Sequence, residues 1–529
     1  MPGFRTRALP IAAALAVAAA LVLRGQQIES FHVEYVGLPA VDLGVSEDIS
    51  HAPDTPEHLA RVQLRAALRT TASGSTATPF APRRIIVRFR DDASPAARDA
   101  VLSDVTSGAV TQPRGEFANF DIVRLSASDD VESVAQALTD RSDVVLYAQP
   151  SYLVHTMFKP NDPRYADLQW NLPLIDMERA WDIQPAAGSN ITVAVLDTGM
   201  AWRNATITAN VPSFRSSGVL YPALGRITVP YSAAPQLVGG VNRIVAPRDF
   251  IWNNADALDF DGHGTHVSGT IGQITNDGVG VAGVAFNVKL MPVKVIDSDW
   301  DFLFGAPNQA TDDVVAQGIR YAADNGANII NMSIGRNGPP APAIEDAMNY
   351  AVGKGVFLAV AGGNGFEDGN QLEVLADICN RIKGAISVAA VGPDKLRAYY
   401  STTGSYMEIA APGGSNRGFA GRSDRGFVWQ QTFDFNFTDT FLLPPAQYAA
   451  QLPRFDVLAY VGYIGTSMAT PHVAGVAAML MQQGIRNPAA LEEAIERSAI
   501  DLGAAGRDSE FGFGLIEARN ALFGMGAAR

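Results

Sequence analysis

The sequence predicts a three-layer α/β/α domain with a mainly parallel central sheet, preceded by a small α+β domain. From about residue 160, short apolar runs rich in β-branched residues alternate with helical stretches. That alternation is typical of a parallel sheet that helices cover on both faces. Ahead of it, residues 83–152 hold a shorter series of strand and helix patterns. The chain has 529 residues, of which 47% are hydrophobic, so it can bury more than one core.

The small domain begins with a strand at residues 84–90, where polar and apolar side chains partly alternate. Ser94 and Pro95 then supply an N-cap and a proline at the first helical position of a helix. The order β-α-(β)-β-α-β that results is that of a ferredoxin-like domain, and its plainest interpretation is an accessory domain. The later elements are a strand at 117–125, a helix at 131–138 and a strand at 144–147.

The large domain contains five apolar runs that are expected to form strands of one sheet. They are continuous rather than alternating, as expected for strands buried on both faces. In such sheets, functional sites form at the carboxyl ends of the strands. The expected strands are residues 191–196, 289–296, 327–334, 356–361 and 385–391, and two of the intervening helices are 312–325 and 342–354.

The N-terminus carries features of an export signal. Arg5 and Arg7 precede an alanine-rich apolar run at residues 8–23 that is short for a membrane span. Residues 1–24 are therefore interpreted as a signal peptide or an uncleaved anchor, and residues 25–82 as a flexible spacer. An exported protein, secreted or located in the periplasm or cell envelope, is expected.

Charge and cysteine content exclude several classes of partner and site. The formal net charge is −14, and no block of basic residues interrupts it. Nucleic acid is therefore not an expected partner, and membrane contact is expected only through the N-terminal segment. The single cysteine, Cys379, excludes an internal disulfide framework and a cysteine metal cluster, and a buried structural role is expected for it.

Two residues that could take part in catalysis stand at the ends of predicted elements: Ser467 at the start of an apolar helix and Asp197 at the end of an apolar strand. Ser467 stands at the predicted start of a helix, where unpaired N–H groups and the helix dipole stabilise negative charge. A cap is the alternative role for Ser467. Asp197 directly follows the strand at 191–196, and a turn-forming role is the alternative for it.

Two further motifs supply a candidate base and a candidate amide donor. His263 lies between two glycines, which leave its ring open to approach. His266 is three residues away, but no metal-binding pattern accompanies the pair, so His266 is expected to pack or bond structurally. Asn364 lies in a glycine-rich turn after the strand at 356–361. It is either a turn residue or an oxyanion donor.

Taken together, Asp197, His263, Asn364 and Ser467 occur in the chain order acid, base, amide and nucleophile. That order distinguishes one type of serine-protease triad from others. Five motifs contain or accompany these residues: Val-Leu-Asp-Thr-Gly at 195–199, His-Gly-Thr-His-Val-Ser-Gly-Thr at 263–270, Asn-Met-Ser-Ile-Gly at 331–335, Gly-Gly-Asn at 362–364 and Gly-Thr-Ser-Met-Ala-Thr-Pro-His at 465–472. In these motifs and their order, the chain resembles the subtilase family of serine endopeptidases (peptidase S8) over residues 162–522.

The resemblance implies roles for these residues. Ser467 would be the nucleophile, His263 the base, Asp197 the group that orients it, and Asn364 the oxyanion donor. The backbone of Ser333, Ile334 and Gly335 would pair with an extended substrate, and Gly362 and Gly363 would line the pocket for the side chain before the scissile bond. Protein or peptide substrates are expected, no cofactor is required for catalysis, and a monomer is expected.

The resemblance also reinterprets the domains. Residues 83–157 would be an inhibitory propeptide and residues 158–529 the subtilisin-like catalytic domain. The chain would then be a self-processing zymogen that is cut between about Tyr152 and Pro160. A catalytically silent peptide-binding or scaffold protein on the same fold is the alternative function, because a fold alone does not fix function.

Three segments depart from the family pattern or are left open by it. Residues 275–281, with Asn276 and Asp277, resemble a structural calcium loop, but the acidic ligand expected soon after Asp197 is not recognisable. The segment between Asp197 and His263, residues 198–262, is unusually long. Residues 414–460 form an aromatic-rich insertion, which is either a wall of the substrate cleft or a satellite core. Arg336 is either a contact for acidic substrates or a solvated charge.

Overall fold

The computed structural model describes residues 80–115, 117–152, 158–216, 218–239, 243–417 and 423–527. The predicted signal or anchor at 1–24 lies outside the described residues, as does the predicted spacer up to residue 79. The small domain and the large domain are each described by themselves. No helix within the described ranges is long and apolar enough to span a membrane.

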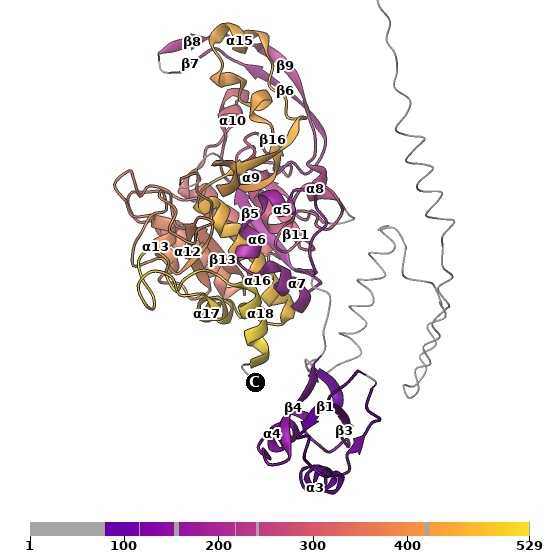
Figure 1. The fold of residues 1–529 in the computed structure, drawn as a ribbon. Coiled ribbons are helices and arrows are strands. Elements are labelled where there is room, and N and C mark those ends of the chain that lie inside the picture. Colours follow the sequence, from indigo (N-terminus) through magenta and orange to yellow (C-terminus); the bar gives the residue numbers. More distant parts are fainter. Residues whose placement is uncertain are drawn as a thin grey trace, which may run out of the picture. The chain divides into compact units, whose positions relative to one another are not determined.

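The small domain is a four-stranded antiparallel sheet with two helices (Figure 1). Its sheet order is β2-β3-β1-β4, and its core contains Ile85, Val87 and Leu138, all fully buried. Strand β1 begins at Phe80, inside the predicted spacer, because Phe80 is buried and pairs with Tyr152. The elements are β1 (Phe80–Phe89), α3 (Pro95–Val105), β2 (Val110–Thr111), β3 (Asp121–Arg124), α4 (Val131–Thr139) and β4 (Val145–Tyr152).

Local sequence explains where the two helices of the small domain begin. The Ser94 side chain accepts a hydrogen bond from the N–H of Ala97, and Pro95 stands at the first helical position of α3. The Asp130 side chain accepts from the N–H of Ser133 at the start of α4. The ferredoxin-like assignment stays an interpretation of this element order.

The large domain is built on a seven-stranded sheet, which agrees with the predicted α/β class. The order is β10-β11-β5-β12-β13-β14-β15, and every pair in it is parallel. The five predicted strands lie at its centre. The two edge strands, β10 and β15, were not predicted. The strands are β5 (Thr192–Asp197), β10 (Arg248–Asp249), β11 (Lys289–Lys294), β12 (Ile329–Met332), β13 (Phe357–Ala361), β14 (Ala385–Val391) and β15 (Ile409–Pro412).

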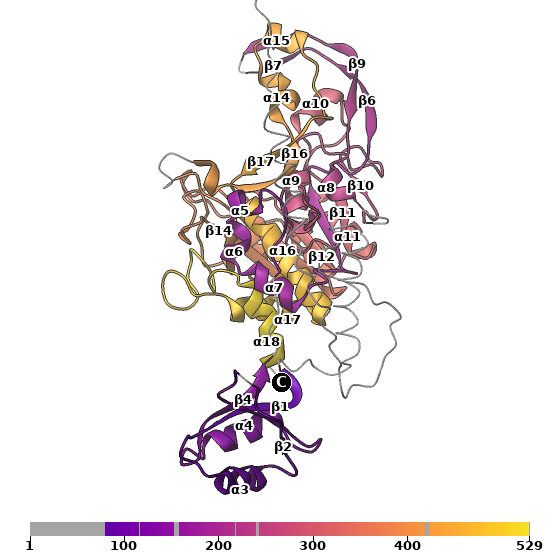
Figure 2. The same cartoon turned by 45° about the vertical axis from the view of Figure 1, so that its right-hand side comes forward.

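Helices cover both faces of this sheet (Figures 1 and 2). One face carries α9 (His263–Gly272) and α16 (Thr466–Gln483), and α16 runs across β12, β13 and β14. The other face carries α11 (Asp312–Asp324), α12 (Pro342–Gly353) and α13 (Val374–Cys379). Because apolar residues on the two faces bury against different helices, the domain has two hydrophobic cores. Helices α5 (Tyr165–Leu168), α6 (Asn171–Leu174), α7 (Met177–Ile183), α8 (Pro235–Val238), α17 (Pro488–Ser498) and α18 (Ala518–Ala527) complete the domain.

The two long insertions form one lobe beyond the sheet, which both views show (Figures 1 and 2). Tyr231, at the end of β9, packs on Phe433 and Phe455 with ring centroids 5.5 and 6.0 Å apart. The Trp300 indole of α10 donates to the carbonyl of Thr438 at 2.7 Å. The lobe comprises β6 (Ala205–Val211), β7 (Phe214–Ser216), β8 (Val219–Tyr221), β9 (Gly225–Tyr231), α10 (Asp299–Phe304), β16 (Val428–Phe433), α14 (Phe435–Thr438), α15 (Pro445–Ala450) and β17 (Leu458–Tyr463), with two short 3₁₀ turns at Ser423–Gly426 and Thr440–Leu442.

Candidate active site

The acid and the base of the predicted site are in direct contact. Asp197 is the last residue of β5, and His263 is the first residue of α9. His263 Nδ1 donates to Asp197 Oδ1 at 2.7 Å, and the side chain of Asp197 is buried. The proton on Nδ1 leaves Nε2 as the nitrogen that can accept one.

The electrostatic environment of His263 favours its protonated form. Burial disfavours the charge on the ring, but the Asp197 carboxylate and its hydrogen bond outweigh that effect. Together they raise the pKa of His263 to about 9. Above that pH the ring is neutral, and its free nitrogen can take a proton from a neighbouring hydroxyl.

Asp259 holds the start of α9 in place, a role that sequence reasoning missed. Its buried carboxylate accepts hydrogen bonds from the N–H of Gly262 at 2.8 Å and of Thr265 at 2.9 Å. It also accepts from the hydroxyls of Thr198 at 3.0 Å and Thr265 at 2.6 Å. Since Thr198 follows Asp197, one carboxylate ties the acid-bearing strand to the histidine helix. An aspartate four residues before His263 was the available signal.

Ser467 lies in the first turn of α16, beside the carboxyl ends of the central strands. Its hydroxyl donates to the carbonyl of Ser333 at 3.1 Å, and among the described residues no hydrogen bond joins it to His263. Both side chains nevertheless line one cavity of about 600 Å³. Catalytic hydrogen bonds are often long in a substrate-free site, and a hydroxyl can rotate.

The side chain of Asn364 is held in one orientation at the same cavity. Its Oδ1 accepts hydrogen bonds from the N–H of Thr466 at 2.9 Å and from the Thr466 hydroxyl at 3.0 Å. Because Oδ1 is occupied in this way, the amide Nδ2 is left to face the cavity, which Asn364 lines together with Ser467. A fixed N–H donor next to a serine hydroxyl is the arrangement that stabilises an oxyanion.

The glycine-bearing segments predicted to bind substrate lie beside the serine. The Ser333 hydroxyl donates to the carbonyl of Ser467 at 2.8 Å, which fixes the segment after β12 to α16. A side chain at Gly335 would collide with the Glu373 carboxylate, and one at Gly363 with the Thr402 hydroxyl. Gly363 also has a φ of +100°, so this position requires glycine, whereas a side chain at Gly335 would have to displace the Glu373 carboxylate. The segments of these two glycines follow β12 and β13, which are neighbours in the sheet.

Arg336, which follows this segment, is engaged within the protein. Its guanidinium makes a two-pronged ion pair with Asp312 at 2.6 and 2.7 Å, and it donates to the carbonyl of Pro339 at 2.8 Å. The guanidinium therefore has its charge neutralised by Asp312.

Comparison with known proteins identifies the chain. The model of the subtilase family (Peptidase_S8) matches residues 188–514. The chain belongs to the subtilase family. A second model, for the fervidolysin N-terminal prodomain, matches residues 67–151. The protein is therefore a subtilisin-like serine protease with an N-terminal prodomain.

Individual relatives cover most of this subtilase. A thermophilic serine proteinase of Bacillus sp. (strain AK1) is 29% identical over 443 residues, which are 83% of this chain and 86% of that protein. Thermitase of Thermoactinomyces vulgaris is 29% identical over 349 residues, or 66% of this chain and 94% of that protein. A solved protease structure from Pseudoalteromonas arctica PAMC 21717 is similar with a TM-score of 0.50 and 28% identity, covering 69% of this chain and 99% of that one.

His266 joins the histidine helix of this subtilase to the insertion lobe. Its Nε2 donates to the carbonyls of Val428 and Val461, both at 3.1 Å, and these residues belong to β16 and β17. Its ring stacks on Tyr463 with centroids 4.3 Å apart. Burial lowers the pKa of His266 to about 3, so the ring is neutral. The aromatic insertion contributes both to a core and to the cavity lining, because Phe433 and Phe455 are buried while Phe427 and Phe435 line the cavity.

The loop at 275–281 contains oxygen atoms that fit the structural calcium that subtilases often bind. The carboxylate of Asp162 is buried, and its Oδ1 has no donor among the described residues. Gln236 Oε1 is likewise buried without a donor, while the Gln236 amide donates to Asp277 at 3.0 Å. Asp162 and Gln236 were not predicted as ligands, because each is distant in sequence from the loop. Asn276 uses its Oδ1 to accept from the N–H of Asn161.

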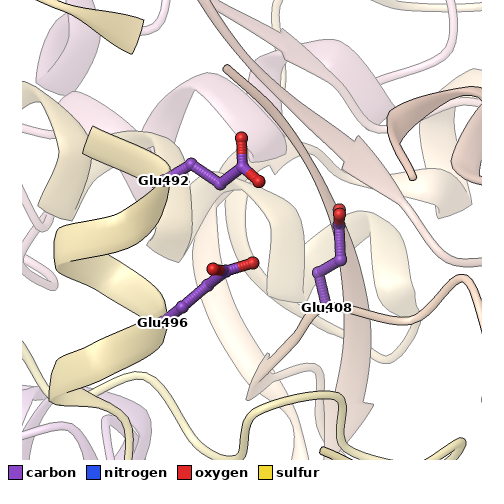
Figure 3. Close-up of side chains that lie close together, drawn as sticks. All are labelled: Glu408, Glu492 and Glu496. Atoms are coloured by element: carbon purple, nitrogen blue, oxygen red, sulfur yellow. The ribbon is translucent and has the colours of Figure 1, made fainter. Parts of the chain in front are cut away.

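Away from this loop, three carboxylates gather where α17 meets the sheet (Figure 3). Oxygens of Glu408, Glu492 and Glu496 lie within 4.8 Å of one another. Glu492 accepts from Lys383 and from the N–H of Gly384, and Glu408 accepts from the N–H of Ser387. Burial, together with the neighbouring carboxylates, raises the pKa of Glu408 and of Glu496 to about 7. Glu408 and Glu496 therefore stay partly protonated near neutral pH.

Proposed function

We propose that this protease cleaves peptide bonds through Asp197, His263 and Ser467. The Ser467 hydroxyl attacks the scissile carbonyl carbon while His263 Nε2 takes its proton. His263 then gives that proton to the departing amine as the C–N bond breaks, which leaves an acyl-serine. Water, activated by the same imidazole, hydrolyses the ester and restores the Ser467 hydroxyl. Asp197 fixes the tautomer of His263 and stabilises its cationic form.

Asn364 and the N–H of Ser467 are the proposed oxyanion donors. The negative charge on the former carbonyl oxygen develops at the start of α16, where unpaired N–H groups favour an anion. Asn364 supports this assignment because Thr466 occupies its Oδ1 and leaves Nδ2 to donate. The substrate itself would add as a strand along Ser333, Ile334 and Gly335, with the side chain before the scissile bond against Gly362 and Gly363.

The prodomain is the proposed intramolecular inhibitor, removed by self-cleavage. Phe158 packs its ring on Trp181 with centroids 5.4 Å apart, and its N–H donates to Asp182 at 2.8 Å. Because these contacts tie Phe158 to the catalytic domain, we place the cut between Tyr152 and Phe158. Export and a monomeric state remain parts of the proposal that rest on the N-terminal sequence and the family.

A structural calcium ion is also proposed, with Asp162, Gln236 and Asp277 as candidate ligands beside the loop at 275–281. Its support is the pair of buried oxygens without donors described above. No step of the hydrolysis passes through the metal.

The single observation that carries the proposed mechanism is the Asp197–His263 pair facing the cavity that Ser467 lines. The test is casein hydrolysis by the secreted wild-type chain, by Ser467→Ala and by wild type treated with a serine-directed organofluorophosphate. Hydrolysis that both Ser467→Ala and the inhibitor abolish is expected. Absence of hydrolysis by a correctly matured wild type would favour the scaffold alternative. Maturation of Ser467→Ala expressed alone would contradict self-processing.

A further inference from the structure

The cavity at the candidate active site is bounded by catalytic residues and by aromatic rings. His263, Asn364 and Ser467 line it together with Phe427, Phe435 and Tyr463. The residues proposed to hold the acyl side of the substrate, Ser333–Gly335 and Gly362–Gly363, are not among its described lining residues. This separation favours the side of Ser467 that receives the leaving group.

One carboxylate at this cavity has no lysine or arginine partner among the ion pairs of the described residues. Asp261 lines the cavity and is exposed, and its Oδ1 accepts from the N–H of His263 at 3.0 Å, which fixes the direction of the side chain. Desolvation of its carboxyl and the nearby Asp259 raise the pKa of Asp261 to about 6, and the positive group that faces it is the imidazole of His263. Asp259 itself is buried and accepts hydrogen bonds from α9 and Thr198. At the alkaline pH at which His263 is neutral, a cation entering the cavity would meet the Asp261 carboxylate without displacing a lysine or arginine.

Aromatic rings face the same space and are held rigidly. Phe435 is 36% exposed, and it stacks on Tyr463 with ring centroids 5.6 Å apart. Tyr463 in turn stacks on His266, whose ring nitrogen binds both strands of the hairpin. Ring faces attract cations and also accept the methylene chain of lysine or arginine.

We propose that this cavity is a subsite for a lysine or arginine side chain directly after the scissile bond. We call it the leaving-group subsite and define it by Asp261, Phe427, Phe435 and Tyr463. Asp261 pairs with the ammonium or guanidinium group, and the rings cover the aliphatic part of the side chain. The inference rests on the proposed function, since it assigns the side of the nucleophile from the proposed acyl-side residues.

The expected preference for a basic side chain follows from the exposure of the ion pair that Asp261 would form with it. An exposed ion pair and a partly desolvated cation–π contact together correspond to about a fivefold to thirtyfold preference. Norleucine is a suitable reference because it keeps the methylene chain of lysine and lacks the charge. A glutamate at the same position meets Asp261 and the negative surroundings of Asp197 and Asp259, so it is disfavoured.

The experiment uses internally quenched peptides of one sequence that differ only in the residue after the scissile bond, which is lysine, norleucine or glutamate. Mass spectrometry of the products confirms that each peptide is cut at the same bond. The matured wild-type protein is expected to give a kcat/KM for lysine about tenfold above that for norleucine. Asp261→Asn is expected to bring that ratio to within about twofold of one, while norleucine is still cleaved.

Asp346→Asn is the matched control, because it makes the same change in net charge on the exposed surface of α12. It should leave the lysine-to-norleucine ratio unchanged. If Asp261→Asn does not mature, the wild type still provides a test, because raising salt from about 0.05 to 1 M should lower the ratio by screening the pair.

The outcomes separate the two proposals. No cleavage of any peptide by the matured wild type contradicts the proposed function. Cleavage with a ratio near one, a ratio that Asp261→Asn or salt does not change, or a preference for basic residues only before the scissile bond would overturn the leaving-group subsite.

Discussion

Replacing Glu496 by glutamine should stabilise the protein at alkaline pH and leave it unchanged in acid. Glu496 ionises with a pKa of about 7 in the folded protein, against an ordinary value of 4.5. Below about pH 4.5 the folded and unfolded chains both hold the proton. As the pH rises towards 7, the unfolded chain loses it first, so the folded state becomes progressively less stable, and the full loss is present above pH 7.

The magnitude follows from the size of this shift. One pKa unit corresponds to about 1.4 kcal/mol, so the shift from 4.5 to about 7 sets an upper limit of about 3.5 kcal/mol. Glu496 is only half-buried and lies close to Glu408 and Glu492, so solvent and the interaction between the carboxylates reduce the value to about 1–2 kcal/mol. Glutamine keeps the shape and removes the charge. In a domain of this size that gain raises Tm by about 1 to 3 °C.

The assay is thermal unfolding at pH 4.5 and pH 8.5 in a Ser467→Ala background, which prevents self-digestion. Lys383 and Arg507 are the basic groups near the cluster, and they remain in place in the variant. Glu493→Gln is the control, because Glu493 lies on the same helix but is exposed and pairs with Arg497. Equal stabilisation at both pH values, or destabilisation at pH 8.5, would refute the reasoning.

Three further predictions concern the catalytic groups, the lobe and the calcium loop. Wild-type kcat/KM should fall as the pH drops below about 9, because protonated His263 cannot act as a base. Asp197→Asn should lower turnover by about 10⁴ and move that limb of the pH profile to lower pH, and an unmoved limb would contradict the Asp197–His263 assignment. Phe455→Ala should lower the free energy of unfolding by about 3–5 kcal/mol, since Phe455 is fully buried. Leu452→Ala, at a 42% exposed position, should change it by less than about 0.5 kcal/mol, and denaturant unfolding compares the two. Chelation of calcium should lower Tm, by an amount that corresponds to about 3 kcal/mol if the ion is present at 100 times its Kd, and Asp277→Asn should remove that response. A Tm that does not depend on calcium would contradict the metal proposal.

Sequence patterns predicted the central sheet well because its strands are buried on both faces. The run at 385–391 matches β14 residue for residue, and the predicted 312–325 helix differs from α11 by one residue at its end. The four residues of the predicted site came from motifs that follow strands or begin helices, and in parallel sheets such positions converge. The second strand of the small domain, predicted at 117–125, forms only at Asp121–Arg124.

The parts that sequence could not predict depend on partners far apart in the chain. Nothing local in residues 205–231 indicates that Tyr231 packs on Phe455, nor that His266 binds the carbonyls of Val428 and Val461. The proximity of Glu408 to Glu492 and Glu496 also depends on residues that are far apart in the sequence. Asp259 is different, because its place before His263 was visible, but only the folded structure joins its carboxylate to Thr198.

The insertion lobe also has a consequence for the order in which the protein folds. The N–H of Gln236 bonds to the side chain of Gln431 across 195 residues, and His266 reaches Val428 across 162. Tyr231, in the early half of the lobe, packs on Phe433 and Phe455 of the late half, so its ring stays uncovered until the late half is synthesised. Closing such distant contacts is slow, and chains that wait with apolar surface uncovered are prone to aggregate. Tyr463 and Ser467 also belong to the late part of the chain. The catalytic site therefore joins Asp197 and His263, which are synthesised early, to groups that are synthesised late.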